Sequence, residues 1–125
     1  MKQIGILPSG VQILHSGSIL HFNEDRILYA ATLAVYVLNA KTFQIEKILS
    51  LNTRAISSIT VSPYDQNLMV VGALDGSVCL WNIDEEEVVS RINTLNGGVF
   101  VAWDPFSPQH CSIVSNESNL KLFYW

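Results

Sequence analysis

The chain of 125 residues has room for one compact domain, and its composition, 49% hydrophobic and 14% charged, is that of a folded globular protein. Its net charge is −4, and its seven Lys and Arg residues are too few and too scattered to neutralise nucleic-acid phosphates or to bind an anionic membrane. No segment approaches the roughly 18 apolar residues of a transmembrane helix. We therefore expect neither nucleic acid nor a membrane among its partners.

Short apolar segments rich in Val and Ile recur along the chain, separated by Asn, Asp, Gly, Ser and Pro. This pattern is typical of β-strands joined by turns, and no segment has sustained helical periodicity. The predicted strands form three sets: 18–22, 26–31, 34–38 and 44–49, then 56–61, 68–73, 78–82 and 87–92, then 99–103, 112–115 and 120–125. The sequence therefore predicts an all-β fold that follows a separate N-terminal segment, 1–17.

The three sets repeat with a period of 42 or 43 residues. The segment VVGALDGSVCLWN at 70–82 aligns with 27–39 one period earlier and with 112–124 one period later. Both alignments keep the apolar strand positions in register. A period of about 40–45 residues with four strands in each unit is that of a β-propeller blade.

Two segments carry a resemblance to a known family. Segment 57–64, SSITVSPY, resembles the first strand of a WD40 repeat, and segment 71–82, VGALDGSVCLWN, resembles the part that ends in Trp-Asp, with Asn82 in place of the Asp. The resemblance implies about two full four-stranded blades and an incomplete third blade of a WD40-type β-propeller. The expected blades are about 18–50, 51–93 and 94–125.

In WD40 repeats an Asp in a tight turn joins a hydrogen-bonded set with a Trp, a Ser or Thr, and a His. Three of those places are matched here and the His is missing, so the resemblance implies a structural set of Asp75, Trp81 and either Ser57 or Ser58. The Asp75–Gly76 pair also predicts the turn itself, because Gly accepts a positive φ without steric cost.

The sequence has no pattern of a catalytic, cofactor or metal site. His15, His21 and His110 share no spacing with cysteines that would make a zinc site. A Gly-x-Ser-x-Gly elbow and a phosphate-binding glycine loop are both absent. We therefore predict no enzyme, no cofactor and no metal. Cys79 and Cys111 are expected to be reduced, buried thiols of an intracellular, cytoplasmic protein, since 1–17 is not the continuous apolar run of a secretion signal.

Two features are candidates for protein contact. Arg54 precedes the first strand of the second blade, on the face where the resemblance implies that partners dock; the alternative is a solvent-exposed Arg. The acidic run 84–87, DEEE, is either a solvated hairpin tip or a contact for a basic peptide. Five large aromatic residues are expected mostly in the core or between blades; they are Tyr36, Tyr64, Trp103, Phe106 and Trp125.

Three blades cannot close a ring, because propellers usually have about four to eight blades. The terminal faces would be apolar and their strand edges open. Missing blades, a partner or self-association would therefore have to cover the open edge. We expect the N-terminal fragment of a longer, non-catalytic WD-repeat scaffold that binds other proteins or peptides. The alternatives are a short isoform completed by a partner, self-assembly, a regulatory fragment without independent binding, and a propeller-fold enzyme.

Overall fold

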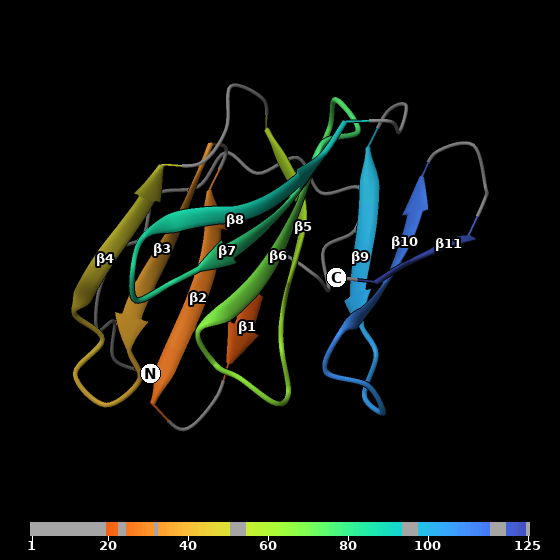
Figure 1. Cartoon of the computed structure of the whole chain (residues 1–125). Helices are drawn as coiled ribbons and strands as arrows, with labels where there is room; N and C mark the ends of the chain where they lie inside the picture. Colours follow the sequence, from red (N-terminus) through yellow and green to blue (C-terminus); the bar gives the residue numbers. More distant parts are fainter. Residues whose placement is uncertain are drawn as a thin grey trace, which may run out of the picture.

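The computed structural model describes residues 20–22, 25–31, 33–50, 55–93, 98–115 and 120–124, and its strands form three antiparallel sheets (Figure 1). The first sheet contains β1 (Leu20–Phe22), β2 (Arg26–Ala31), β3 (Ala34–Asn39) and β4 (Ile45–Ser50). The second contains β5 (Ile56–Val61), β6 (Leu68–Ala73), β7 (Val78–Asn82) and β8 (Glu87–Ile92). The third contains β9 (Val99–Trp103), β10 (His110–Ser115) and β11 (Leu120–Tyr124). In every sheet, strands that are consecutive in the chain are neighbours.

Each predicted strand is present, and most begin and end within one residue of the expected bounds. The strand β10 begins at His110, two residues before its predicted start. The reason is a hydrogen bond from Asp104 N–H to His110 O at 3.0 Å, which closes the preceding loop. The predicted N-terminal segment 1–17 and Trp125 lie outside the described residues.

The turns that connect β3 to β4 and β7 to β8 are built alike, one sequence period apart. Asn39 and Asn82 each accept a backbone N–H of their own turn on the side-chain oxygen, at 2.8 Å and 3.2 Å. Phe43 and Glu86 then adopt positive φ angles of 58° and 56°. Asn82 stands where the Trp-Asp pair of a WD40 repeat has its aspartate, and Asn39 lies one period earlier. Both still stabilise a turn, because an Asn side chain accepts local backbone hydrogen bonds.

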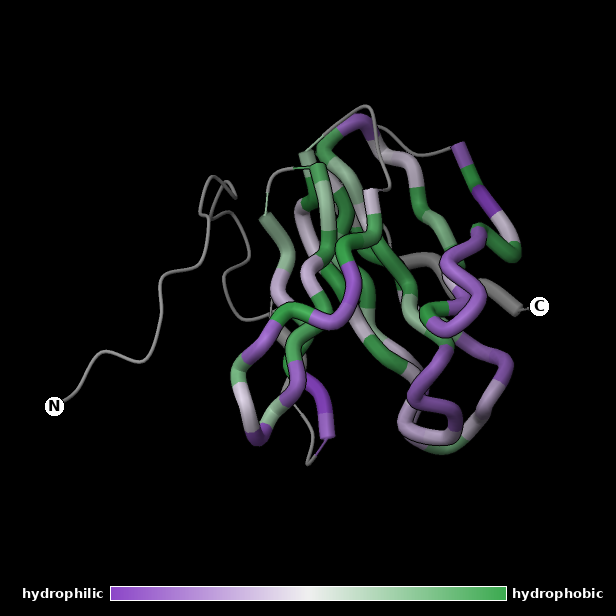
Figure 2. Tube along the Cα trace, turned by 90° about the vertical axis from the view of Figure 1, so that its left-hand side faces the viewer, coloured by the Kyte–Doolittle hydropathy of each residue, from purple (hydrophilic) through white to green (hydrophobic). Residues whose placement is uncertain are grey.

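The strands β5, β6 and β7 of the second sheet are buried on both faces, which explains their nearly continuous apolar sequence, whereas β8 is exposed. One buried cluster joins this sheet to the first sheet; its members are Leu28, Ala30, Val35, Val37, Leu49, Ile56, Ile59, Val61, Met69, Val71, Cys79, Trp81 and Ile83. The other joins it to the third sheet; its members are Val70, Val78, Leu80, Val99, Val101, Trp103, Cys111 and Ile113. Figure 2 shows hydrophobic residues along the strands and mostly hydrophilic residues in the loops at the lower end.

The second and third sheets approach closely where Gly72 faces Val99. A Cβ on Gly72 would lie 2.5 Å from Val99 Cγ2 and 3.1 Å from Ser58 Oγ, so no side chain fits there. The register of β5 shifts between Ile56 and Ser58, which marks a β-bulge. A bulge re-aims side chains, and here the consecutive residues Ser57 and Ser58 both reach the third sheet.

Hydroxyl groups of β5 bind the edge strand of the third sheet, in a contact that we call the serine seam. The hydroxyls of Ser57 and Ser58 donate to Val99 O at 2.6 Å and 3.0 Å. They also accept backbone N–H groups, Ser57 from Val99 at 3.3 Å and Ser58 from Val101 at 3.0 Å. The strand β9 lies at the edge of its sheet, where N–H and C=O groups have no strand partner. The serine seam therefore satisfies buried backbone groups that would otherwise remain unpaired.

We predict that Gly72→Ala destabilises the protein by about 1–3 kcal/mol, because the added methyl group overpacks the serine seam. Urea unfolding followed by fluorescence measures this change. The control is Ser50→Ala on the exposed side of β4, for which we expect little change. An unfolding midpoint of Gly72→Ala equal to that of the unmodified chain would contradict the close approach of the two sheets.

Candidate protein-interaction surface

One end of the sheets is formed by the loops 40–44, 62–67, 83–86 and 104–109, which we call the loop end (Figure 1). Backbone hydrogen bonds tie loops of the same sheet together. Ala40 N–H donates to Asp25 O at 3.0 Å, and one period later Ile83 N–H donates to Asn67 O at 2.7 Å. The loops are therefore held to the sheets and to one another.

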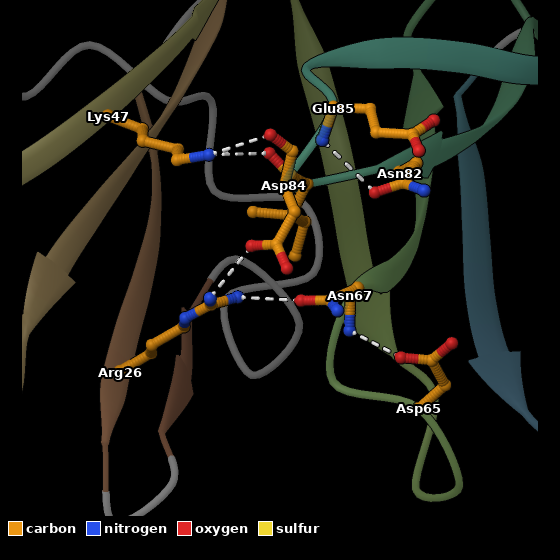
Figure 3. A network of polar contacts seen from close by, with 8 residues as sticks. Arg26, Lys47, Asp65, Asn67, Asn82, Asp84 and Glu85 are labelled. Atoms are coloured by element: carbon orange, nitrogen blue, oxygen red, sulfur yellow. Dashed lines mark hydrogen bonds and ion pairs between the residues drawn. The ribbon is translucent and has the colours of Figure 1, made fainter.

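Arg26 and Lys47 join the first sheet to the second at the loop end (Figure 3). The guanidinium of Arg26 donates to Asn67 Oδ1 at 3.2 Å and to Asp84 Oδ1 at 3.0 Å. Lys47 Nζ donates to the carbonyl oxygens of Ile83 and Asp84 at 3.2 Å and 2.9 Å. The side chain of Asp84 is 49% exposed, so solvent screens its attraction to Arg26. The contact therefore positions the loops more than it adds stability.

A polar pocket of about 290 Å³ lies beside this contact. Its lining residues carry both signs of charge; they are Asp25, Arg26, Asn39, Lys41 and Glu46. Asn39 Nδ2 donates to Glu46 Oε1 at 3.0 Å across one side of it. Because the charges are mixed, the pocket does not select an anion or a cation by charge alone.

The acidic run 84–87 is exposed at the turn between β7 and β8. The pKa of Glu85 is raised, first by a side-chain hydrogen bond with Glu87 and then by repulsion from the same carboxylate, with smaller contributions from desolvation and from Asp84. The turn is therefore a local centre of negative charge. Its role as a contact for a basic peptide stays a prediction.

Two aromatic side chains at the loop end are exposed, and for Phe106 this corrects the expectation of a place in the core or between blades. Phe106 is 92% exposed and Tyr64 is 51% exposed. Tyr64 Oη donates to Pro105 O at 2.6 Å, so its loop contacts the loop of the next sheet. Strand periodicity did not apply to these residues, because both lie in loops beside prolines. The neighbouring prolines were the sequence signal that could have predicted a loop position for both residues. Of the other aromatic residues, Trp103 is buried, Tyr36 is half-buried and Trp125 lies outside the described residues.

The residues predicted to form one WD-type hydrogen-bonded set are Ser57, Ser58, Asp75 and Trp81. Both serine hydroxyls donate to the third sheet within the serine seam, and so neither donates to Asp75. Trp81 Nε1 is buried without a hydrogen-bond partner among the described residues. The β-bulge at Ser57 directs the two hydroxyls to the third sheet, and the single hydrogen-bonded set stays a prediction.

Asp75 stabilises the turn between β6 and β7. Its Oδ1 accepts the backbone N–H and the hydroxyl of Ser77, at 2.9 Å and 2.7 Å. Gly76 has a φ of 86°, the conformation for which the Asp-Gly turn was predicted. These two hydrogen bonds of Asp75 are structural and local to the turn.

The remaining candidates do not form a catalytic group among the described residues. Arg54 and His15 lie outside that part of the chain, and the side chain of His21 is not described. His110 Nδ1 lies 2.5 Å from Ser107 Oγ within the loop 104–109. The sequence pattern did not predict this pair, which spans only three residues and closes a loop.

Cys79 and Cys111 are free and buried, as predicted. Burial raises the pKa of the Cys111 thiol to about 12. Within the described ranges, no three His, Cys, Asp or Glu side chains are grouped so that they could hold a metal ion. No helix in the same ranges has the length and apolar character needed to cross a bilayer.

Sequence comparison finds similarity to parts of two mouse proteins, while no family model matches the chain. Gem-associated protein 5 is 34% identical over 68 residues, which cover 53% of this chain and 4% of that protein. Protein transport protein Sec31B is 32% identical over 77 residues, which cover 61% of this chain and 7% of that protein. The chain therefore spans less than a tenth of either relative.

Structural comparison finds the same fold in a solved structure, the crystal structure of the mitotic checkpoint complex. The TM-score is 0.73, over 84% of this chain and 32% of the matched chain, with 17% sequence identity. At this identity the likeness concerns the fold alone. It establishes the three sheets as blades of the propeller type predicted from the repeat.

We predict that Ser58→Ala destabilises the protein by about 1–3 kcal/mol, because it leaves the buried backbone N–H of Val101 unsatisfied and removes one of the two serine hydrogen bonds to Val99 O. Chemical denaturation measures this loss. Ser90→Ala, at an exposed position on β8, is the matched control and should stay close to the unmodified chain. Equal stabilities for the two variants would contradict the role of the serine seam.

We predict that the free energy of unfolding falls as the pH rises from about 9 to about 12, because the folded-state pKa of Cys111 is raised above its ordinary value of 9.0. Below the ordinary value the thiol is neutral in both states, so its contribution is fully present there. Urea unfolding over this pH range measures the slope. Cys111→Ala should reduce the slope. A slope that is identical in the unmodified chain and in Cys111→Ala would contradict the assignment.

Proposed function

We propose that this chain, which has the fold of WD40-type β-propeller blades, is a non-catalytic scaffold that binds other proteins or peptides. The observation that carries the proposal is the loop end, where exposed aromatic and charged side chains lie on loops held by hydrogen bonds to packed sheets. Exposed loops on a rigid frame are the usual place for binding residues. The names of the similar proteins support the proposal, since one is Gem-associated and the structural neighbour belongs to a complex.

A scaffold role is favoured over catalysis because the polar side chains at the loop end are engaged with one another. Arg26 is paired with Asp84, and the amide of Asn39 binds Glu46. The pocket beside Arg26 is lined by charges of both signs, and three of its lining residues, Arg26, Asn39 and Glu46, already take part in these contacts.

We further propose that the three sheets belong to a longer ring of WD repeats. The outer face of the first sheet supports this, because Tyr29, Tyr36 and Ile48 are register partners in one cross-strand row. Ile48 is 54% exposed at the end of that row. In repeat architectures such an apolar face is covered by a neighbouring repeat. A further blade, a partner or a second copy would cover it here.

The sequence supports an N-terminal position in that ring. Segments 3–12, 29–36 and 54–59 resemble the N-terminal region of WD repeat-containing protein seventeen. Both mouse relatives are more than ten times longer than the part of them that this chain covers. We also propose an intracellular, cytoplasmic location, which the two free, buried thiols support.

Photo-crosslinking of the full chain in cells tests the scaffold function. A photoreactive amino acid is introduced singly at the exposed positions Lys41, Asp75 and Phe106, which sample both ends of the sheets. We expect discrete cross-linked proteins from at least one position and none without illumination. A folded chain that gives no discrete product at any position would contradict the proposal. That result would favour the alternative, a regulatory fragment without independent binding. The exposed Ile48 fits this alternative too, since it lies on an apolar face that a missing blade would cover.

A further inference from the structure

Two adjacent loops of the loop end form an exposed apolar surface, which we call the aromatic ledge. It consists of Pro63, Tyr64, Pro105 and Phe106, all of them exposed. Tyr64 Oη joins the two loops through its hydrogen bond to Pro105 O at 2.6 Å. The ring of Phe106 is 92% exposed, so no described residue covers it. A large aromatic side chain in this position presents apolar area that a partner can bury.

Hydrogen bonds fix the backbone of the ledge on both loops. Phe106 N–H donates to Asp104 Oδ1 at 2.8 Å. Tyr64 N–H donates to Ser62 Oγ at 3.1 Å, and Ser62 is itself buried. A surface that is already ordered loses little conformational entropy when a partner binds. The ledge therefore combines apolar exposure with the rigidity that binding requires.

Negative charge borders the ledge on the side of the second sheet. Asp65 follows Tyr64 and is exposed, and its Oδ1 accepts the N–H of Asn67 at 2.9 Å. Asn67 in turn contacts Arg26, whose charge is offset by Asp84 (Figure 3). The acidic run 84–87 continues from there, and the raised pKa of Glu85 reports its crowded carboxylates. A cation is attracted to this border, whereas a phosphate is repelled.

We propose that the aromatic ledge binds an arginine-containing segment of a partner protein. A guanidinium can stack on the rings of Tyr64 and Phe106 and can also donate hydrogen bonds to the carboxylate of Asp65. Arginine fits this surface better than lysine, because its planar group stacks on aromatic rings and binds carboxylates with two donors. The inference rests on the proposed scaffold function and adds the place and the chemistry of the partner.

Peptide binding to the full chain tests the inference. The probe is a fluorescent peptide of alternating arginine and glycine, and its twin has glutamate in place of arginine. We expect the arginine peptide to raise fluorescence anisotropy in a saturable way that weakens with salt. We expect no binding of the glutamate peptide.

Matched variants locate the binding. Phe106→Ala should weaken the arginine peptide about fivefold or more, because the cation–aromatic contact and the buried ring are lost. Phe106→Tyr, which keeps an aromatic ring, should retain the affinity for the arginine peptide. Val89→Ala, at a 54% exposed position on β8, should leave this affinity unchanged. Asp65→Asn should weaken binding and lower its salt dependence, whereas Glu46→Gln, another exposed carboxylate, should do neither.

Three results would overturn the inference: no binding of the arginine peptide, equal binding by the unmodified chain and Phe106→Ala, or preference for a single-stranded oligonucleotide over the peptide. Failure here is separable from failure of the scaffold function. If positions 75 or 41 give discrete photo-crosslinks but the affinity for the arginine peptide is unchanged by Phe106→Ala, the scaffold function is retained and binding at the aromatic ledge is rejected. A chain without any crosslink would reject the scaffold itself.

Discussion

The close approach of the second and third sheets at Gly72 is the constraint on which the rest of the structure depends. The edge of β9 has backbone groups without a strand partner, and buried groups of this kind must be satisfied. Ser57 and Ser58 satisfy them from β5. They reach β9 only because Gly72, the register partner of Ser58, has no side chain. One glycine and one bulge thus join two sheets that share no backbone ladder.

The sheets do not repeat this contact elsewhere in the described structure. The first and second sheets are joined by an apolar cluster and by Arg26 and Lys47 at the loop end. One period after Ser58 and Thr60, β9 has Phe100 and Ala102, which lack hydroxyl groups. The third sheet cannot offer the same seam to a neighbour. Blades whose sequences depart from the repeat therefore keep its strand geometry, while the contacts between neighbouring blades differ. The loops that these contacts position differ as well.

Local sequence patterns predicted the strands, the repeat and the Asp75–Gly76 turn, because strand periodicity and turn chemistry depend on neighbouring residues. They could not predict the partners of Ser57, because a one-residue bulge decides which sheet its side chain meets. Arg26 and Asp84 lie 58 positions apart in different sheets, so no local pattern connects them. The exposed ring of Phe106 was missed because strand periodicity, which places large aromatic residues in the core, does not apply to a residue in a loop.

Amide hydrogen exchange along β9, resolved by residue, tests the central claim that the blades are locked together through the serine seam. The N–H groups of Phe100 and Ala102 face β10 within the sheet, whereas those of Val99 and Val101 bind serine hydroxyls. We expect similarly slow exchange for both sets, because the β9–β10 ladder holds the first set and the serine seam holds the second, so that neither set faces solvent. Fast exchange at Val99 and Val101 beside slow exchange at Phe100 and Ala102 would show a free edge and would contradict the claim.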